Sequence, residues 1–223
     1  MKSMKLLLII ATLMFGVQFT NAQASNQNAV IIFVDNSGSS KTVLPEQIAL
    51  SKEYLRRVEA GTPVFVFGFA TDPVSKTATI ARGVQCEQDK QIVSEHLDQV
   101  FSVVGQTRLI DGLFSIAELF ENDGFSNCKE LKNIQILLIS DGEDRASVRK
   151  LSDLISKLKA TAVKVDAVGV ISELPNERGF LPQSPRQRAR DFLNRLTRDS
   201  GGRVVFAKKG QKATEVVAEF FRQ

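Results

Sequence analysis

The chain has 223 residues, of which 43% are hydrophobic and 24% are charged, and this composition suits one globular domain with a sizeable core. Its formal net charge is +4, and it falls to +2 without the first 24 residues, which contain two lysines and no acidic residue. Basic and acidic residues are interspersed along the rest of the chain, so the charge gives no support to a protein that binds nucleic acid or anionic membrane surfaces.

The N-terminus has the pattern of a secretory signal peptide. Lys2 and Lys5 precede an apolar run from Leu6 to about Val17, and Ala22-Gln23-Ala24 offers small residues for cleavage. The apolar run is shorter than the roughly 20 residues that span a bilayer, and an uncleaved anchor is the alternative. We therefore expect residues 1–24 to be removed and residues 25–223 to form a secreted or periplasmic domain without a stable membrane span.

The first strong structural signal is the stretch from Val30 to Ser40. Apolar residues run without interruption to Asp35, and the hydroxyl residues Ser37 and Ser39 follow at two-residue spacing. Such a run predicts a strand that is buried on both faces, as in a parallel sheet covered by helices. Ligands of open α/β sheets bind at the carboxyl ends of the strands, so these three polar residues are candidate ligand-binding residues.

The remaining chain alternates between strand and helix patterns. Further strands are predicted at 64–70, 77–81, 134–139, 162–171 and 204–207. Helices are predicted at 45–60, 87–104, 109–122, 146–160, 187–200 and 213–221. The strand at 77–81 is short and polar on one side, which is typical of an edge. We therefore expect an α/β fold with a doubly wound, mostly parallel six-stranded sheet, one antiparallel edge strand and helices on both faces.

Two further polar residues are expected at the same edge of this sheet. Thr107 opens the helix that begins at Leu109, and Asp141 follows the strand at 134–139. Two of the segments have a simpler interpretation on their own: the residues from Ser37 to Ser40 could simply begin a helix, and Asp141 could cap a helix near Ala146. Asp144 could supply that cap instead, which would leave Asp141 available for a ligand.

These segments, in this order, resemble the von Willebrand factor type A domain. The metal-ion-dependent adhesion site of that family combines a D-x-S-x-S segment with a distant Thr and a distant Asp. The matching residues here are Asp35, Ser37, Ser39, Thr107 and Asp141. The resemblance extends from about residue 29 to residue 221. It implies a binding domain without enzymatic activity, whose metal is bridged by an Asp or Glu side chain of a protein ligand.

The residue types give a chemical reason for such a site. Oxygen ligands suit Mg²⁺, and Mn²⁺ would also fit. The hydroxyls of Ser37, Ser39 and Thr107 are neutral, so the positive charge of the ion would be incompletely neutralised and could attract a carboxylate. Because Asp35 lies at a strand end, we also expect Asp35→Ala to remove metal binding and to leave the fold intact.

Other functions have weaker support from the sequence. A serine hydrolase built on Ser37 or Ser39 would need a nearby base, and His96, the only histidine, falls within a predicted helix. Phosphate-binding and dinucleotide-binding glycine motifs are absent from the sequence. The main alternative is a scaffold or assembly subunit with a structural metal. Its partner would bind elsewhere, for example along the basic helix predicted at 187–200.

Two features near the C-terminus leave alternatives open. The segment 172–185 is longer than usual connections in α/β units. It follows a strand that runs towards the edge of the sheet where the candidate metal residues are expected, so it either shapes the choice of partner or is a disordered loop. Five arginines at 186, 188, 190, 195 and 198 form either a solvated basic face, which we favour, or a patch that binds polyanions.

Cys86 and Cys128 are the only cysteines in the chain. An exported protein can form a disulfide. An antiparallel edge strand would bring Cys86 to the end of the sheet opposite the metal, and Cys128 falls there too because it comes just before the strand that begins at Ile134. We therefore predict a disulfide between them.

Overall fold

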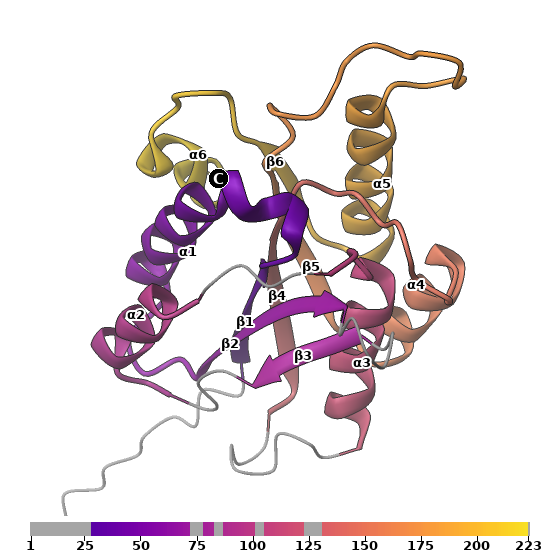
Figure 1. Ribbon diagram of the computed structural model, residues 1–223. Coiled ribbons are helices and arrows are strands. Elements are labelled where there is room, and N and C mark those ends of the chain that lie inside the picture. The colour runs from indigo at the N-terminus through magenta and orange to yellow at the C-terminus, as the bar shows by residue number, and fades with distance from the viewer. Residues whose placement is uncertain (1–27, 72–77, 83–86, 101–104, 123–130, 223) are drawn as a thin grey trace, which may run out of the picture.

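The computed structural model describes residues 28–71, 78–82, 87–100, 105–122 and 131–222, and Figure 1 shows the arrangement of their helices and strands. The strands are β1 (Asn28–Asp35), β2 (Val64–Thr71), β3 (Ala78–Arg82), β4 (Asn133–Ser140), β5 (Lys164–Gly169) and β6 (Val204–Phe206). The helices are the 3-10 helix η1 (Gly38–Thr42), α1 (Leu44–Arg57), α2 (Lys90–Asp98), α3 (Leu109–Glu121), α4 (Leu151–Ala160), α5 (Pro185–Ser200) and α6 (Ala213–Phe221).

The strands form one sheet in the order β3-β2-β1-β4-β5-β6. β1 lies between β2 and β4 and is parallel to both, and β5 and β6 continue the parallel arrangement. β3 pairs antiparallel with β2 at the edge. The expected α/β architecture with a largely parallel sheet is confirmed. The register pairs Val34 with Ile139, so β1 and β4 end side by side although they are far apart in the sequence.

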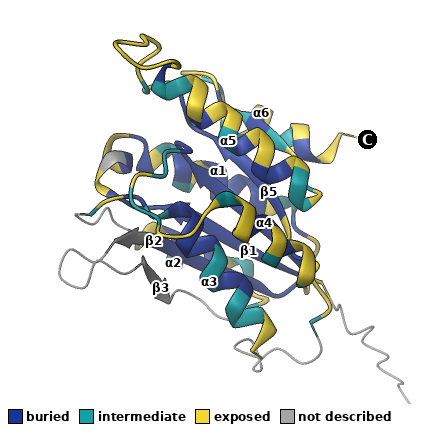
Figure 2. Cartoon of the chain, turned by 90° about the vertical axis from the view of Figure 1, so that its right-hand side faces the viewer, coloured by how far each residue is buried: buried dark blue, intermediate teal, exposed yellow. Residues whose placement is uncertain are grey.

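Helices cover both faces of the sheet, and alternate residues of β1 point to the two layers. Ile31 and Phe33 belong to the core that includes α3, α4 and α5, whereas Ile32 and Val34 belong to the core that includes α1, α2 and α6. Figure 2 shows β1, β4 and β5 largely in dark blue, as buried strands, while the outer faces of the helices are exposed in yellow. The continuous apolar run in β1 is therefore explained by burial on both sides.

The parallel strands all end at one edge of the sheet. η1 follows β1 there, the β4–α4 connection follows β4, and the segment from Ser172 to Ser184 follows β5 (Figure 1). This edge collects loops from different parts of the chain, and it is the edge at which open α/β sheets bind ligands.

Two predicted helices begin or end differently in the structure. The helix predicted at 146–160 begins only at Leu151, because the backbone N–H groups of Val148 and Arg149 donate to the Asp111 carboxylate instead of entering a helix. The helix predicted at 87–104 begins at Lys90, where the Asp89 side chain accepts the Gln91 N–H, and it ends at Asp98.

Some sequence predictions fall on residues outside the described ranges. The signal peptide at 1–24 is one of them, and the disulfide between Cys86 and Cys128 is another. Within the described ranges, none of the helices combines the length and apolar character that a membrane span requires.

Candidate metal site

Asp35 is the last residue of β1, and its side chain is completely buried. One carboxylate oxygen, Oδ1, accepts the backbone N–H of Ser37 at 3.0 Å, and the other, Oδ2, accepts the Ser140 hydroxyl at 2.9 Å. Burial raises the pKa of Asp35 because the charged form loses hydration, and the hydrogen bonds from Ser37 and Ser140 oppose that rise. The fold therefore buries a carboxylate whose negative charge a cation would stabilise.

Asp141 brings a second carboxylate to the same place from the end of β4. Its Oδ1 accepts the Glu143 N–H at 2.9 Å, and only 5% of the residue is exposed. Burial, followed by repulsion from the nearby Asp35 carboxylate, raises the pKa of Asp141 to about 7. Two buried carboxylates that repel each other form a site that a cation would stabilise.

The hydroxyls of Ser37 and Thr107 complete the observed cluster. Both side chains are buried, and Ser37 Oγ lies 3.0 Å from Thr107 Oγ1. Ser39 belongs to η1 directly after this segment, and only its backbone is described. The structure therefore brings together four of the five predicted ligands and places the backbone of the fifth beside them.

Thr107 is held in position by the loop that carries Asp141. The Thr107 carbonyl oxygen accepts the N–H groups of Arg145 and Ala146 at 3.0 and 3.2 Å. Asp144 Oδ1 accepts the N–H of Leu109 at 2.9 Å, so it caps the first turn of α3. The alternative interpretation, in which Asp141 or Asp144 caps the next helix, does not hold, since that helix begins at Leu151 with Lys150 at its N-cap.

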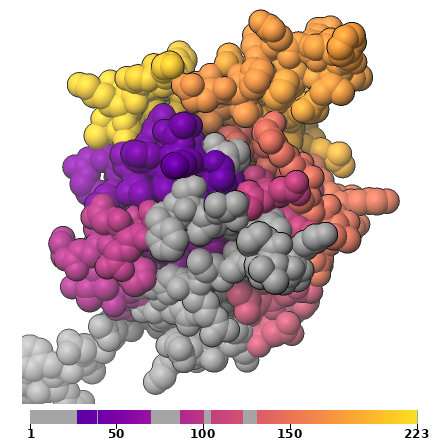
Figure 3. Space-filling model, in the orientation of Figure 1, coloured from indigo at the N-terminus to yellow at the C-terminus, as the bar shows by residue number. Residues whose placement is uncertain are grey.

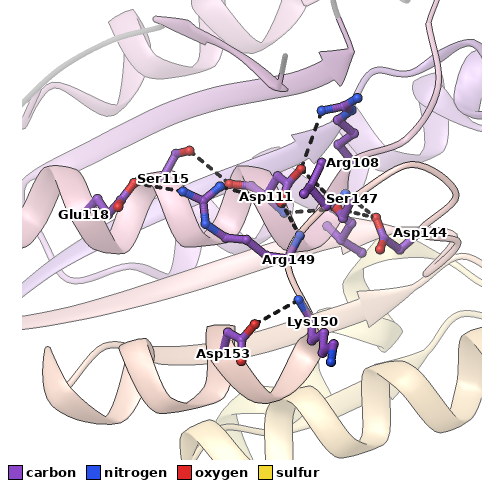
Figure 4. A network of polar contacts seen from close by, with 11 residues as sticks. Arg108, Asp111, Ser115, Glu118, Asp144, Ser147, Arg149, Lys150 and Asp153 are labelled. Atoms are coloured by element: carbon purple, nitrogen blue, oxygen red, sulfur yellow. Dashed lines mark hydrogen bonds and ion pairs between the residues drawn. The ribbon is translucent and has the colours of Figure 1, made fainter. Parts of the chain in front are cut away.

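Asp111 fixes the other end of the same loop, as Figure 4 shows. This buried residue in the first turn of α3 accepts the N–H groups of Val148 and Arg149 at 3.0 and 3.1 Å. The guanidinium groups of Arg108 and Arg149 each lie 3.7 Å from its carboxylate. The loop that delivers Asp141 is thus attached to α3, the helix that follows Thr107.

The sequence did not single out Asp111 or Ser140 as site residues. An acidic residue in the first turn of a helix is a recognisable signal, but nothing local shows that Asp111 binds a loop 37 residues away. Ser140 is completely buried, donates to Asp35, and accepts the Gly142 N–H at 3.0 Å. Gly142 has a positive φ of 74°, which allows the chain to turn sharply after Asp141.

The residues present fit a hard divalent cation. They supply only oxygen atoms, and in the described part of the chain no three His, Cys, Asp or Glu side chains form a cluster that could hold a metal. A metal here would depend on hydroxyls as well as carboxylates. Neighbouring ligands of an octahedral Mg²⁺ at 2.0–2.1 Å are roughly 2.9 Å apart, close to the observed separation of the Ser37 and Thr107 hydroxyls. That separation is also that of a hydrogen bond, which a metal would replace.

The contacts do not resemble a hydrolase centre. Ser37 Oγ has Thr107 as its neighbour, and His96 lies on α2, a helix that packs against α1 and β2.

The five arginines between residues 186 and 198 do not form one uniform basic face, because Arg195 and Arg198 are paired with Asp199 at 3.6 and 2.9 Å.

Comparison with known proteins shows similarity of fold. No protein-family model and no curated protein sequence matches the chain. A von Willebrand factor type A structure from Catenulispora acidiphila superimposes with a TM-score of 0.60 at 15% identity, over 86% of this chain and 41% of that one. Proximal thread matrix protein 1 from the mussel byssus gives a TM-score of 0.61 at 22% identity, over 86% and 45%. The manganese-loaded Plasmodium vivax TRAP protein gives 0.57 at 17% identity, over 88% and 74%.

The chain spans less than half the length of the first two of these structures. The TM-scores of 0.57 to 0.61 show a common fold. At identities of 15 to 22% the comparison does not extend to the metal site, which has to be judged from the residues themselves.

Proposed function

We propose that this chain, which has a von Willebrand factor type A-like fold, is an exported binding module. In this proposal it binds a protein ligand through a divalent metal. Asp35, Ser37, Ser39, Thr107 and Asp141 are its proposed metal residues. The carrying observation is that the Ser37 and Thr107 hydroxyls lie 3.0 Å apart beside two buried carboxylates at the carboxyl ends of β1 and β4. The similar TRAP structure is manganese-loaded, which supports a divalent ion at this fold.

The ligand set explains why the ion would bind a partner. The neutral hydroxyls could coordinate Mg²⁺, or Mn²⁺ in its place, directly, while Asp35 and Asp141 would hold its waters or take a position themselves. Part of the charge of the ion would then remain available. An Asp or Glu side chain of a protein ligand is a hard anionic group that can complete the coordination. In the proposal this chain supplies no catalytic group, and its role is binding.

A scaffold with a structural metal is the second candidate. One of the similar structures is a matrix protein of the mussel byssus, which favours a structural role for this fold in at least that protein. The two candidates differ in one measurable respect. If the purified protein captures a partner from the native cell envelope and releases it when EDTA is added, the metal-dependent binding module is supported, whereas capture that survives EDTA would favour the scaffold.

Export is part of the proposal. It rests on the sequence pattern of residues 1–24, with cleavage near Ala22 to Ala24. Mass spectrometry of the protein recovered from the cell envelope or medium should give an N-terminus close to residue 25. An intact N-terminus retained in the membrane fraction would contradict cleavage and favour an anchor.

Thr107 provides a conservative test of the hydroxyl ligands. Thr107→Val removes Oγ1 while keeping the side-chain shape, so we expect Mg²⁺ binding in isothermal titration to weaken at least tenfold, about 1.4 kcal/mol. The matched control is Thr107→Ser, which keeps the hydroxyl and should retain binding. Equal affinities for the valine and serine variants would contradict a ligand role for Thr107.

A further inference from the structure

A pocket with basic and apolar lining residues lies at the same edge of the sheet as the candidate metal site. It is an open cavity of about 430 Å³ between the residues that follow β5 and β6 and the first turns of α5. Figure 3 shows the surface here, where the yellow C-terminal residues meet the orange residues of the segment that follows β5 and of α5. The lining residues are three apolar ones, one serine and four basic ones: Ile171, Phe206, Ala207, Ser172, Arg186, Arg190, Lys208 and Lys209.

The two arginines of this pocket are held in place by contacts that leave their charge uncompensated. Arg186 donates from Nε to the carbonyl oxygen of Leu174 at 3.1 Å and from Nη2 to those of Ser172 and Leu174 at 2.7 and 2.8 Å. The guanidinium carbon of Arg190 lies 4.2 Å from the centre of the Phe206 ring. Both side chains are therefore already ordered for a ligand, which lowers the entropy lost on binding.

Carboxylates do not neutralise most of the charge in this pocket. Within the described ranges, Arg186, Arg190 and Lys208 form no ion pair, and only Lys209 is paired, with Glu173 at 3.1 Å. Residues 171–212 include ten basic and four acidic residues, although the net charge of the whole chain is only +4. A concave surface with this charge attracts anionic groups.

The sheet topology places the pocket at a definite position relative to the metal site. The candidate metal residues come from the ends of β1 and β4, and the pocket begins at the ends of β5 and β6. These strands are neighbours in the order β1-β4-β5-β6, so the two sites are about two strand spacings apart, roughly 10 Å. A peptide in the polyproline II conformation rises about 3.1 Å per residue and has three residues per turn, so side chains three residues apart point to the same side at a spacing of about 9 Å.

We propose that this pocket binds a second carboxylate of the protein ligand, about three residues from the carboxylate that reaches the metal. The inference rests on the proposed function and specifies the ligand as an extended acidic segment. Arginine guanidinium groups bind carboxylates through paired hydrogen bonds. The cations surround a single cavity with an apolar wall of Ile171 and Phe206, which suits one side-chain group better than a long polyanion.

Fluorescence anisotropy with synthetic peptides tests this inference. One labelled peptide carries two glutamates three residues apart in a Gly/Ser background, and a second carries one glutamate. In Mg²⁺ we expect the two-glutamate peptide to bind at least tenfold more tightly. Arg190→Gln should abolish this gain and leave the binding of the one-glutamate peptide unchanged. Arg198→Gln, on the same helix but paired with Asp199, is the matched control and should change neither.

The results separate this inference from the proposed function. EDTA could leave the binding of both peptides unchanged while Arg190→Gln still weakens the binding of the two-glutamate peptide. That result would support an acidic ligand in the basic pocket and would contradict the metal-dependent function. Equal binding of the two peptides, or a gain that survives Arg190→Gln, would overturn the inference. A heparin oligosaccharide whose binding depends on Arg190, together with no gain from the second glutamate, would also overturn it and would assign the pocket to a polyanion.

Discussion

Asp35→Asn is expected to stabilise the protein in EDTA at neutral pH by about 1–3 kcal/mol, because it removes a completely buried charge. The amide can replace the carboxylate at the Ser37 N–H and at Ser140, where the direction of the hydrogen bond is reversed. Its oxygen can accept the Ser37 N–H, and its NH₂ group can donate to Ser140 Oγ, which has room for a second donor beside the Gly142 N–H. The same variant should gain nothing from Mg²⁺, whereas the wild-type protein should gain about 2.7 kcal/mol at an ion concentration 100 times the Kd.

Urea unfolding with and without Mg²⁺ measures both effects. Asp98→Asn is the control, because this exposed carboxylate on α2 forms only a surface pair with Lys52 and should alter neither quantity. Asp35→Ala is less suitable than the sequence indicated. It would leave the buried Ser37 N–H and Ser140 hydroxyl without their acceptor, so we expect it to lower stability as well as to remove metal binding. An Asp35→Asn variant that is less stable in EDTA, or that still responds to Mg²⁺, would contradict the account.

The metal-free protein should also lose stability as the pH rises from about 4 to about 7. The pKa of Asp141 is raised from 3.8 to about 7 in the folded state, chiefly by burial. The folded protein therefore keeps this proton through a pH range in which the unfolded chain has released it. Because the folded state then binds more protons, the free energy of unfolding falls with pH across that range. Asp141→Asn should reduce this dependence in EDTA, and part of it should remain because burial also raises the pKa of Asp35.

Asp111→Ala is expected to destabilise the domain by about 2–4 kcal/mol, which corresponds to a fall in Tm of roughly 5–15 °C. The change removes the acceptor of the Val148 and Arg149 N–H groups and leaves the neighbouring Arg108 without its carboxylate. The loop from Asp141 to Lys150 would then be attached less firmly to α3. We therefore expect Mg²⁺ affinity to fall as well, although Asp111 is not a proposed ligand.

Two comparisons locate the cause of this effect. Asp111→Asn keeps one acceptor oxygen and should lie between alanine and the wild-type protein. Glu118→Ala removes the more exposed carboxylate that also faces Arg149, at 3.8 Å, and should cost less than about 1 kcal/mol. Thermal unfolding followed by circular dichroism gives the order. Equal losses for Asp111→Ala and Glu118→Ala would show that the backbone contacts of Asp111 are not important.

The α/β fold could be predicted because its signals are local. The apolar runs of β1 and β4 are buried on both faces, and most of the helices have one apolar side, so composition and spacing identified them. The start of α4 could not be found in this way. Residues 146–150 were predicted as helical, but Val148 and Arg149 bind a carboxylate from α3, and such a long-range contact leaves no trace in the local pattern.

The candidate site could be predicted in part for a similar reason. Asp35, Ser37 and Asp141 follow apolar strands directly, and parallel strands end at a common edge, so the sequence indicated that they lie together. The sequence did not show that Asp35 is completely buried or that Ser140 binds it, because both depend on the packing of neighbouring strands. The basic pocket beside β5 and β6 also could not be predicted, since its cations come from the β6–α6 connection and from α5.

The most direct test of the metal site uses Mn²⁺ as a paramagnetic probe of the ¹⁵N-labelled protein. A small amount of Mn²⁺ should broaden the amide signals of residues around Asp35, Thr107 and Asp141, and excess Mg²⁺ should restore them. Signals from the far edge of the sheet, such as Asn133, should stay sharp, because that residue lies at the other end of β4. Broadening centred on another carboxylate group, or no selective broadening at millimolar Mn²⁺, would contradict a metal site at the carboxyl ends of β1 and β4.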